Sequence, residues 1–178
     1  DLNFPWGLEF RDGHEIIVTE LGGTLQHIDL AGNISEPVSE TPSVFRAGQG
    51  GLFHFLRHPD FNENKQIYLS YASGDEGSNY TNVAKATWNK EGLTSLEVIS
   101  KATPSKYAAL HYGGRLAWLP DKTLLLTTGE PVRLSRKSPR SSHSFRQNCE
   151  NGRKRRTSKR QSIYLQLWTS KFTRAGGF

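Results

Sequence analysis

The sequence predicts an all-β chain made of short antiparallel meanders, in which each strand pairs with its neighbour along the chain. Apolar and polar residues alternate over short stretches, which is the pattern of a half-buried strand. Turn signals rich in glycine, proline and aspartate separate these stretches. The 17 glycines and the 11% aromatic content are typical of many short strands. No helical periodicity is evident before residue 131, and 178 residues suffice for one domain with a sizeable core.

The first meander begins near Trp6. Leu8 and Phe10 alternate with polar neighbours, a turn follows, and the β-branched run 16–19 forms the next strand. A Gly-Gly pair then turns the chain into a third strand at 25–28.

Two further copies of this pattern follow along the chain. The second comprises expected strands at 50–57, 66–71, 81–88 and 93–99, with a loop at 58–64. The third runs from His111 to Gly129, with a turn at 120–122 between its two strands. Copies spaced tens of residues apart indicate the blades of a β-propeller. Two to three blades cannot close a ring, so we expect a partial propeller with an open edge. Trp6, Trp88 and Trp118 are expected in the blade cores.

The net charge of +6 combines two halves of opposite sign. Residues 1–130 carry ten Lys and Arg against sixteen Asp and Glu, a net charge of −6. Residues 131–178 carry thirteen Lys and Arg against one acid, a net charge of +12. We therefore divide the chain into a propeller fragment, 1–130, and a basic, low-complexity tail, 131–178, which is expected to be disordered or irregular.

Other classes of protein are set aside by composition. No apolar run approaches the roughly 20 residues that a membrane-spanning helix needs. A single cysteine, Cys149, excludes a disulfide within the chain and leaves the redox compartment open.

His111 is the histidine with the clearest chemical use, because it lies on a loop directly before a predicted strand. Loops carried by a rigid sheet often hold reactive side chains. The alternative is a loop histidine satisfied by the backbone. Gln49, between glycines, is a second candidate, and its alternative is a plain turn residue.

Four stretches resemble the soluble pyrroloquinoline quinone (PQQ) dependent glucose/sorbosone dehydrogenases, the aldose sugar dehydrogenase family. Their order and spacing agree with the family, and the resemblance covers residues 3–130, about the first third of a full member. The stretches are Pro5-Trp-Gly-Leu-Glu-Phe10, Val18-Thr-Glu20, Gly48-Gln-Gly-Gly-Leu52 with His58-Pro-Asp-Phe61, and His111-Tyr-Gly-Gly-Arg-Leu116.

The resemblance implies a six-bladed propeller that oxidises an aldose to its lactone, with PQQ as cofactor and Ca²⁺ as metal. His111 matches the family base, which takes the proton of the anomeric hydroxyl, and an imidazole can do this near neutral pH. Gln49 matches a residue beside cofactor and sugar. The family also implies a periplasmic or secreted location, an aldose as substrate and no membrane partner; the electron acceptor stays open.

The chain departs from the family after Glu130. Members carry there an arginine that contacts the quinone, and Arg133 falls near that place by count alone. Later family runs and most calcium ligands are missing, and the residues themselves suggest no metal site. Weak or no activity is therefore expected from this chain.

The tail is interpreted as family sequence read in a shifted frame. Taking the last two bases of each codon with the first base of the next, permissible codons for 165–175 yield Tyr-Ser-Tyr-Gly-His-Arg-Asn-Ser-Gln-Gly-Leu. The same shift over 138–149 yields Ala-Gln-Asp-Leu-His-Thr-His-Leu-Gly-Lys-Ile-Val. Both are family runs, in the family order, so a break near 130–133 is the hypothesis.

Three other interpretations stay open. The basic run 153–160 could make the chain a propeller-derived binding module with a nucleic-acid-contacting tail, which we favour less than the frame shift. His54 and His58 have the spacing of helical metal ligands, but on a strand and loop this favours core packing and turn roles. The stretch 60–64 begins like a calcium loop, yet lacks the required sixth glycine and final glutamate, which favours a plain turn.

Overall fold

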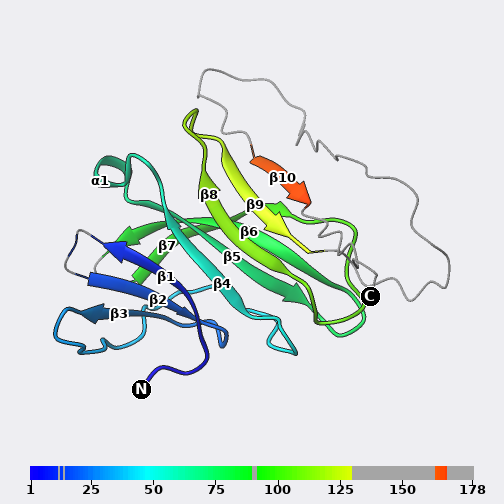
Figure 1. Cartoon of the computed structure of the whole chain (residues 1–178), viewed down its shortest axis with the longest axis horizontal. Coiled ribbons are helices and arrows are strands. Elements are labelled where there is room, and N and C mark those ends of the chain that lie inside the picture. Colours follow the sequence, from blue (N-terminus) through cyan, green and yellow to red (C-terminus); the bar gives the residue numbers. More distant parts are fainter. Residues whose placement is uncertain (12, 14, 90–91, 130–162, 168–178) are drawn as a thin grey trace, which may run out of the picture.

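The computed structural model describes residues 1–129, except 12, 14 and 90–91, together with residues 163–167. Within this part the chain forms three sheets and one helical turn (Figure 1). The first sheet has the order β1 (Pro5–Arg11), β2 (Glu15–Glu20), β3 (Leu25–Asp29). The second has the order β4 (Leu52–Arg57), β5 (Gln66–Gly74), β6 (Asn79–Asn89), β7 (Gly92–Lys101). The third has the order β10 (Ile163–Leu167), β9 (Leu124–Thr128), β8 (Gly113–Trp118).

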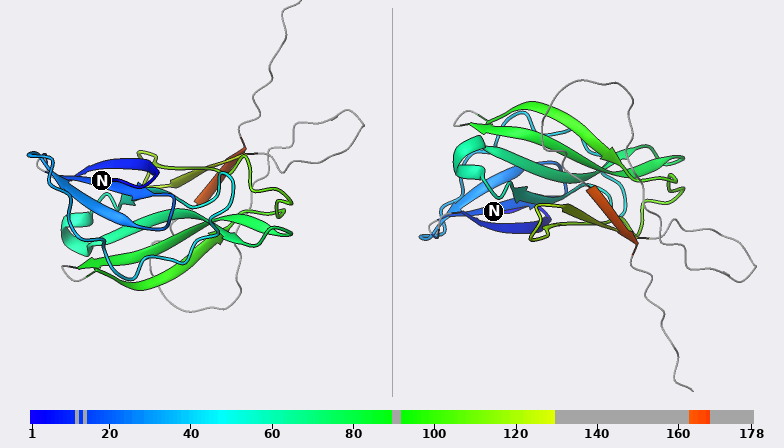
Figure 2. Two further views of the ribbon diagram at one scale, coloured as in Figure 1. Left: turned by 90° about the horizontal axis from the view of Figure 1, so that it is seen from below. Right: turned by 90° about the horizontal axis from the view of Figure 1, so that it is seen from above.

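Strands β1 to β9 pair antiparallel with their sequence neighbours inside each sheet, which confirms the predicted meanders. The three sheets stack face against face, and their first strands lie next to one another: β1 contacts β4, and β4 contacts β8 (Figure 2). Adjacent sheets arranged around their first strands are the blades of a propeller. The all-β, partial-propeller prediction is therefore confirmed, and the described sheets do not close into a ring.

The core lies between the sheets. One apolar cluster joins the first sheet to the second, where the Phe55 and Trp88 rings meet edge to face at 5.5 Å. Another joins the second sheet to the third, where Tyr68 meets Trp118 at 5.1 Å. β4 serves both clusters, and it is buried over its first four residues. A central blade needs apolar residues on both faces, and strands buried on both faces have near-continuous apolar runs.

Three expectations need correction. Trp6 is 55% exposed, because none of the three described sheets covers that face of β1. The stretch expected to be a plain turn contains the helical turn α1 (Phe61–Asn64), closed by Lys65 in the left-handed conformation. Five residues of the tail form β10, which pairs parallel with β9, and their alternating apolar sequence suits a strand. The remaining tail residues, Arg133 and Cys149 among them, lie outside the described part.

No helix within the described residues is both long and apolar enough to cross a membrane.

Candidate active site

His111 and Gln49, 62 residues apart in the chain, meet at one end of the blades. The backbone N–H of His111 donates a hydrogen bond of 2.8 Å to Oε1 of Gln49. The backbone N–H of Gln49 in turn donates to the carbonyl of Ala109, also at 2.8 Å. Both residues are exposed. The structure thus brings together the two residues that the sequence singled out, in loops that precede β4 and β8.

Close backbone packing holds these two loops together. Gly48 has a φ of 51°, and a Cβ there would lie 2.6 Å from the carbonyl oxygen of Ala109. His111 itself has a φ of 56°, a left-handed conformation that is uncommon for a residue with a side chain. A Cβ on Gly129, at the end of β9, would overlap the carbonyl of His111. Glycines on both sides therefore allow the backbone to hold His111 in a sparsely populated conformation.

Lys106 is a buried cation beneath the His111 loop. Its side chain is only 4% exposed, and Nζ donates to the carbonyl oxygens of His111 at 3.0 Å and Gly129 at 2.8 Å. Its backbone exchanges two hydrogen bonds with Asn79 at the start of β6. Lys106 therefore ties the His111 loop to the third sheet through its ammonium and to the second sheet through its backbone. Sequence reasoning did not identify Lys106, because a single lysine in a loop carries no pattern that distinguishes it.

Tyr112, next to His111, has a structural role. Its hydroxyl donates to Oδ1 of Asn79 at 2.6 Å, and Thr81 donates to its carbonyl oxygen at 3.1 Å. Burial raises the pKa of the Tyr112 phenol to about 12, so it stays protonated at neutral pH. The ring packs on Phe53 at 5.3 Å. Tyr112 therefore anchors the loop, while His111 faces solvent.

Charged side chains from each first strand come together where β1, β4 and β8 meet. Burial raises the pKa of Glu9, and the positive charges of Arg57 and Arg115 oppose that shift. Burial, helped by Arg115, lowers the pKa of His54 to about 4, so this imidazole is neutral at pH 7. Nδ1 of His54 accepts a hydrogen bond of 3.2 Å from the backbone N–H of Leu116, which joins two blades.

His54 and His58 do not form a metal pair. His54 is 96% buried between the second and third sheets, and His58 accepts a hydrogen bond from the backbone N–H of Asp60 in the turn. The predicted core and turn roles are confirmed. Within the described part of the chain, no group of three or more His, Cys, Asp and Glu could hold a metal ion.

Known proteins match both the sequence and the structure. The sequence profile of the family Glucose / Sorbosone dehydrogenase matches residues 2–148. An uncharacterized protein of Synechocystis, slr1608, is 34% identical over 137 residues, which is 72% of this chain and 33% of the relative. The aldose sugar dehydrogenase YliI of Escherichia coli is 33% identical over 133 residues, 72% of this chain and 36% of the relative.

A solved structure agrees with these sequence matches. The PQQ-bound aldose sugar dehydrogenase of Streptomyces coelicolor superposes with a TM-score of 0.64 at 28% identity, over 74% of this chain and 39% of that one. The chain spans about a third of the length of the curated relatives it matches.

Proposed function

Because the chain belongs to the glucose/sorbosone dehydrogenase family, we propose that it carries the base and the amide of a PQQ-dependent site for the oxidation of aldose sugars. The hydrogen bond from the His111 backbone to the Gln49 side chain carries this proposal. It supports the proposal because it joins the backbone of His111, whose imidazole can accept a proton, to the side-chain amide of Gln49, in loops on two different blades. Because the chain spans only about a third of its relatives, the activity of a whole family member is itself part of the proposal.

The hydrogen bond leaves the reactive groups of both residues available. It uses the backbone N–H of His111, so it does not occupy the imidazole. It uses Oε1 of Gln49, so the amide N–H₂ can still donate to a ligand. In the oxidation of an aldose to its lactone, the anomeric hydroxyl loses a proton and C1 loses a hydride. We assign the proton to the His111 imidazole, acting as general base. Bound PQQ would supply the acceptor for the hydride.

The described residues fit PQQ in part. The quinone and its carboxylates need hydrogen-bond donors and cations. Gln49 can supply a donor, and Arg46, whose Nη1 donates to the carbonyl oxygens of Gly48 at 3.1 Å and Gly50 at 3.3 Å, supplies an exposed cation at the same loop. Arg133 stays the proposed quinone contact, although it lies outside the described residues. Calcium binding likewise stays an expectation from the family.

A dye-linked assay tests the proposal. The chain is incubated with PQQ and Ca²⁺, and reduction of the dye is followed with glucose as substrate. We expect weak turnover that requires PQQ and that falls by about 10²-fold or more in His111→Ala, the usual contribution of a general base. Asn62→Ala, an exposed change at the far end of the blade, is the control and should leave turnover unchanged. Absence of any PQQ-dependent turnover would contradict enzymatic activity of this chain.

A second function, that of a nucleic-acid-contacting module, receives less support. It depends on residues 153–160, which lie outside the described part, and the matching family and relatives do not point to it. We propose a periplasmic or secreted location from the family alone, which fractionation of the source cells would test.

A further inference from the structure

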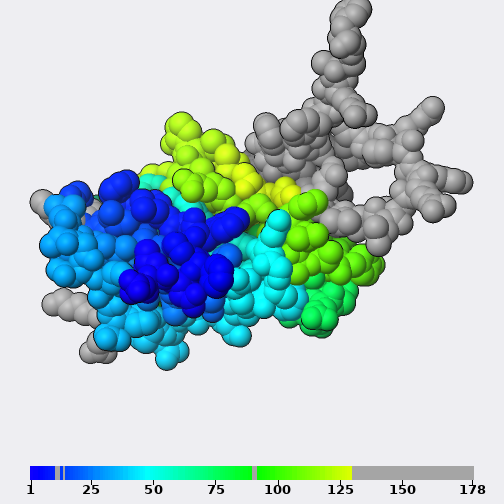
Figure 3. Space-filling model, turned by 60° about the horizontal axis from the view of Figure 1, so that its bottom comes forward, coloured from blue at the N-terminus to red at the C-terminus, as the bar shows by residue number. Residues whose placement is uncertain are grey.

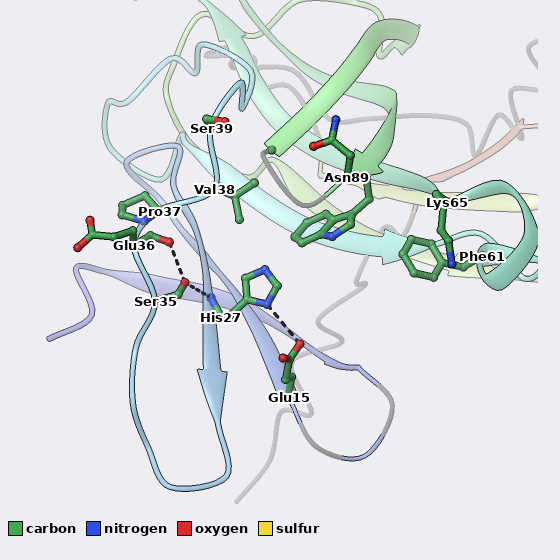
Figure 4. A pocket seen from close by; sticks show the side chains of 12 residues that line it. Glu15, His27, Ser35, Glu36, Pro37, Val38, Ser39, Phe61, Lys65 and Asn89 are labelled. Carbon is green, nitrogen blue, oxygen red and sulfur yellow. Dashed lines mark hydrogen bonds and ion pairs between the residues drawn. The ribbon is translucent and has the colours of Figure 1, made fainter.

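We propose that a pocket between the first and second sheets, at the end of the blades away from His111, binds a saccharide ring. The pocket has a volume of about 830 Å³ and lies among β2, β3, the segment 35–39, α1, the end of β6 and the start of β7 (Figure 4). That volume is within the range of small-molecule sites, roughly 300 to 1,000 Å³. Its polar and aromatic lining includes Glu15, His27, Glu36, Lys65, Trp88 and Asn89.

The pocket is separate from the proposed active site. Gln49 precedes β4, whereas Phe61 of the pocket follows β4, so the strand separates the two sites. β6 likewise begins beside Lys106, under the His111 loop, and ends at Asn89 in the pocket. Six residues of β4 alone span roughly 20 Å. This inference therefore does not depend on the proposed function.

Backbone hydrogen bonds fix one wall of the pocket. The segment 35–39 runs beside β3, where the N–H of Ser35 donates to the carbonyl of His27 and the N–H of Val38 donates to the carbonyl of Leu25, both at 2.9 Å. A Cβ on Gly92 would overlap Ser39, so glycine allows this segment to lie against the start of β7. The wall is thus formed before any ligand binds, which lowers the entropy cost of binding.

The floor of the pocket is apolar and aromatic. Trp88 packs against Phe55 at 5.5 Å and against the His27 ring at 5.1 Å, and its backbone N–H donates to the carbonyl of Lys65 at 2.8 Å. Phe61 and Val38 extend this surface. The C–H groups on one face of a pyranose ring can pack on such a surface.

The rim carries both hydrogen-bond acceptors and donors. Figure 4 shows Glu15 and His27 meeting at one side, with 3.4 Å between Oε2 and Nδ1, and Lys65 beside Phe61 at another. Asn89 adds an amide that can both donate and accept, whereas Figure 4 shows the Glu36 carboxylate pointing away from the Trp88 and His27 rings. Sugar hydroxyls also donate and accept, so they can bond to carboxylate, amide and ammonium groups at once. An apolar floor with a ring of mixed polar groups fits a saccharide.

The charges and the polar groups of the rim argue against two other classes of ligand. The Glu15 carboxylate and the Lys65 ammonium balance each other, so the rim lacks the excess of cations that a phosphate would need. A purely apolar ligand would cover the Glu15–His27 pair and the Lys65 ammonium without offering hydrogen bonds to them, which is costly where they are desolvated. An organic cation is the remaining competitor, and the experiment includes it.

The test follows backbone, indole and side-chain amide signals of the full chain by NMR, without PQQ, during titration with maltose, cellobiose, arginine methyl ester or inorganic phosphate. We expect one of the two disaccharides to shift the signals of His27, Trp88 and Asn89, and arginine methyl ester and phosphate not to do so. Equal or larger shifts with arginine methyl ester, or no shift at these residues with either disaccharide, would overturn the proposal.

Variants locate the binding. The double variant Glu15→Ala/Asn89→Ala removes the carboxylate that pairs with His27 and the amide of the rim, and it should weaken saccharide binding about tenfold or more. The matched control, Glu63→Ala/Asn62→Ala, removes one carboxylate and one amide from exposed positions of α1 that do not line the pocket, and should bind as the original chain does. His111→Ala should also bind unchanged. Loss of binding in His111→Ala with retention in the pocket variant would assign the saccharide to the other end of the blades.

Discussion

At the scale of single residues, the candidate active site depends on how the backbone of His111 is held. A left-handed residue with a side chain is under strain that neighbouring contacts must offset. Gln49 binds its N–H and Lys106 binds its carbonyl. Both polar groups of this peptide backbone are thus satisfied by side chains, one of them charged, which fixes the direction in which the imidazole leaves the chain.

Lys106→Met should destabilise the protein by about 3 kcal/mol, because it leaves two carbonyl oxygens without their charged donor. Denaturant titration gives the free energy of unfolding. Lys122→Met is the matched control, since Lys122 is largely exposed and pairs with Asp60 at the surface; its effect should stay within about 1 kcal/mol. Equal losses in the two variants would contradict the role assigned to Lys106.

His54 predicts a dependence of stability on pH. Its pKa is about 4 in the folded protein, against an ordinary value of 6.5, so the folded state binds fewer protons between these values. The free energy of unfolding should therefore have its full value above about pH 6.5. It should decrease by about 3 kcal/mol as the pH drops toward 4. The lowered pKa of His58 acts in the same direction, and the raised pKa of Glu9 in the opposite one.

Denaturant titrations at several pH values would measure this dependence. His54→Gln keeps an acceptor for the Leu116 N–H but removes the titrating group, so its stability should change less over the same pH range. If the original chain and His54→Gln gave parallel curves, the assignment to His54 would be wrong.

At the scale of elements, the ends of β8 and β9 determine where the His111 loop lies. β8 and β9 pair with a register shift between Gly113 and Leu116, and β9 then ends where Gly129 lies against the His111 carbonyl. Such irregularities commonly redirect a strand next to a site. The hairpin thus serves as the support of the loop as well as a pair of blade strands.

Gly129→Ala should separate β9 from the His111 loop. The added Cβ overlaps backbone, which cannot move away as a flexible side chain can, and the expected cost is about 1–3 kcal/mol or more. Gly22→Ala is the control, because a Cβ there meets nothing within 4 Å. Thermal or denaturant unfolding compares the two, together with the NMR signals of His111 and Gln49. Unchanged signals and stability in Gly129→Ala would contradict the close approach.

At the scale of the whole molecule, one face of β1 carries large apolar side chains that no other described element covers. Phe4, Trp6, Leu8 and Phe10 are 47–65% exposed, and the space-filling view shows β1 at the surface (Figure 3). A contiguous patch of large apolar side chains favours association with another surface. Ile17 and Leu25 of the same sheet are buried against the second sheet, so the exposure of β1 arises from its position in the stack and not from composition.

Leu8→Lys/Phe10→Lys should reduce self-association of the chain. Sedimentation velocity over a range of concentrations would show it, with the original chain associating more strongly as concentration rises. Leu30→Lys/Leu96→Lys adds the same charge at two exposed apolar positions away from β1 and should associate as the original does. A chain that stays monomeric at every concentration would contradict this prediction.

The boundary near residue 130 stays a proposal about the chain as a whole. We propose that residues 131–178 are family sequence read in a shifted frame, and the nucleotide sequence of the locus is the test. A single insertion or deletion near the codons for 130–133 should restore the family reading. Two observations connect the tail with the rest of the chain. The family profile matches through residue 148, and β10 at 163–167 pairs with β9.

The order of strands, the turns between them and the residue types at positions 49 and 111 could be predicted from the sequence, because alternation and turn chemistry are local properties. The meeting of His111 with Gln49, the burial of Lys106 under that loop and the exposure of Trp6 could not. Each depends on which blade packs against which face, and contacts between residues far apart in the chain decide that. A tryptophan in an alternating strand has the same local sequence whether or not another sheet covers it, so only the tertiary structure distinguishes the two.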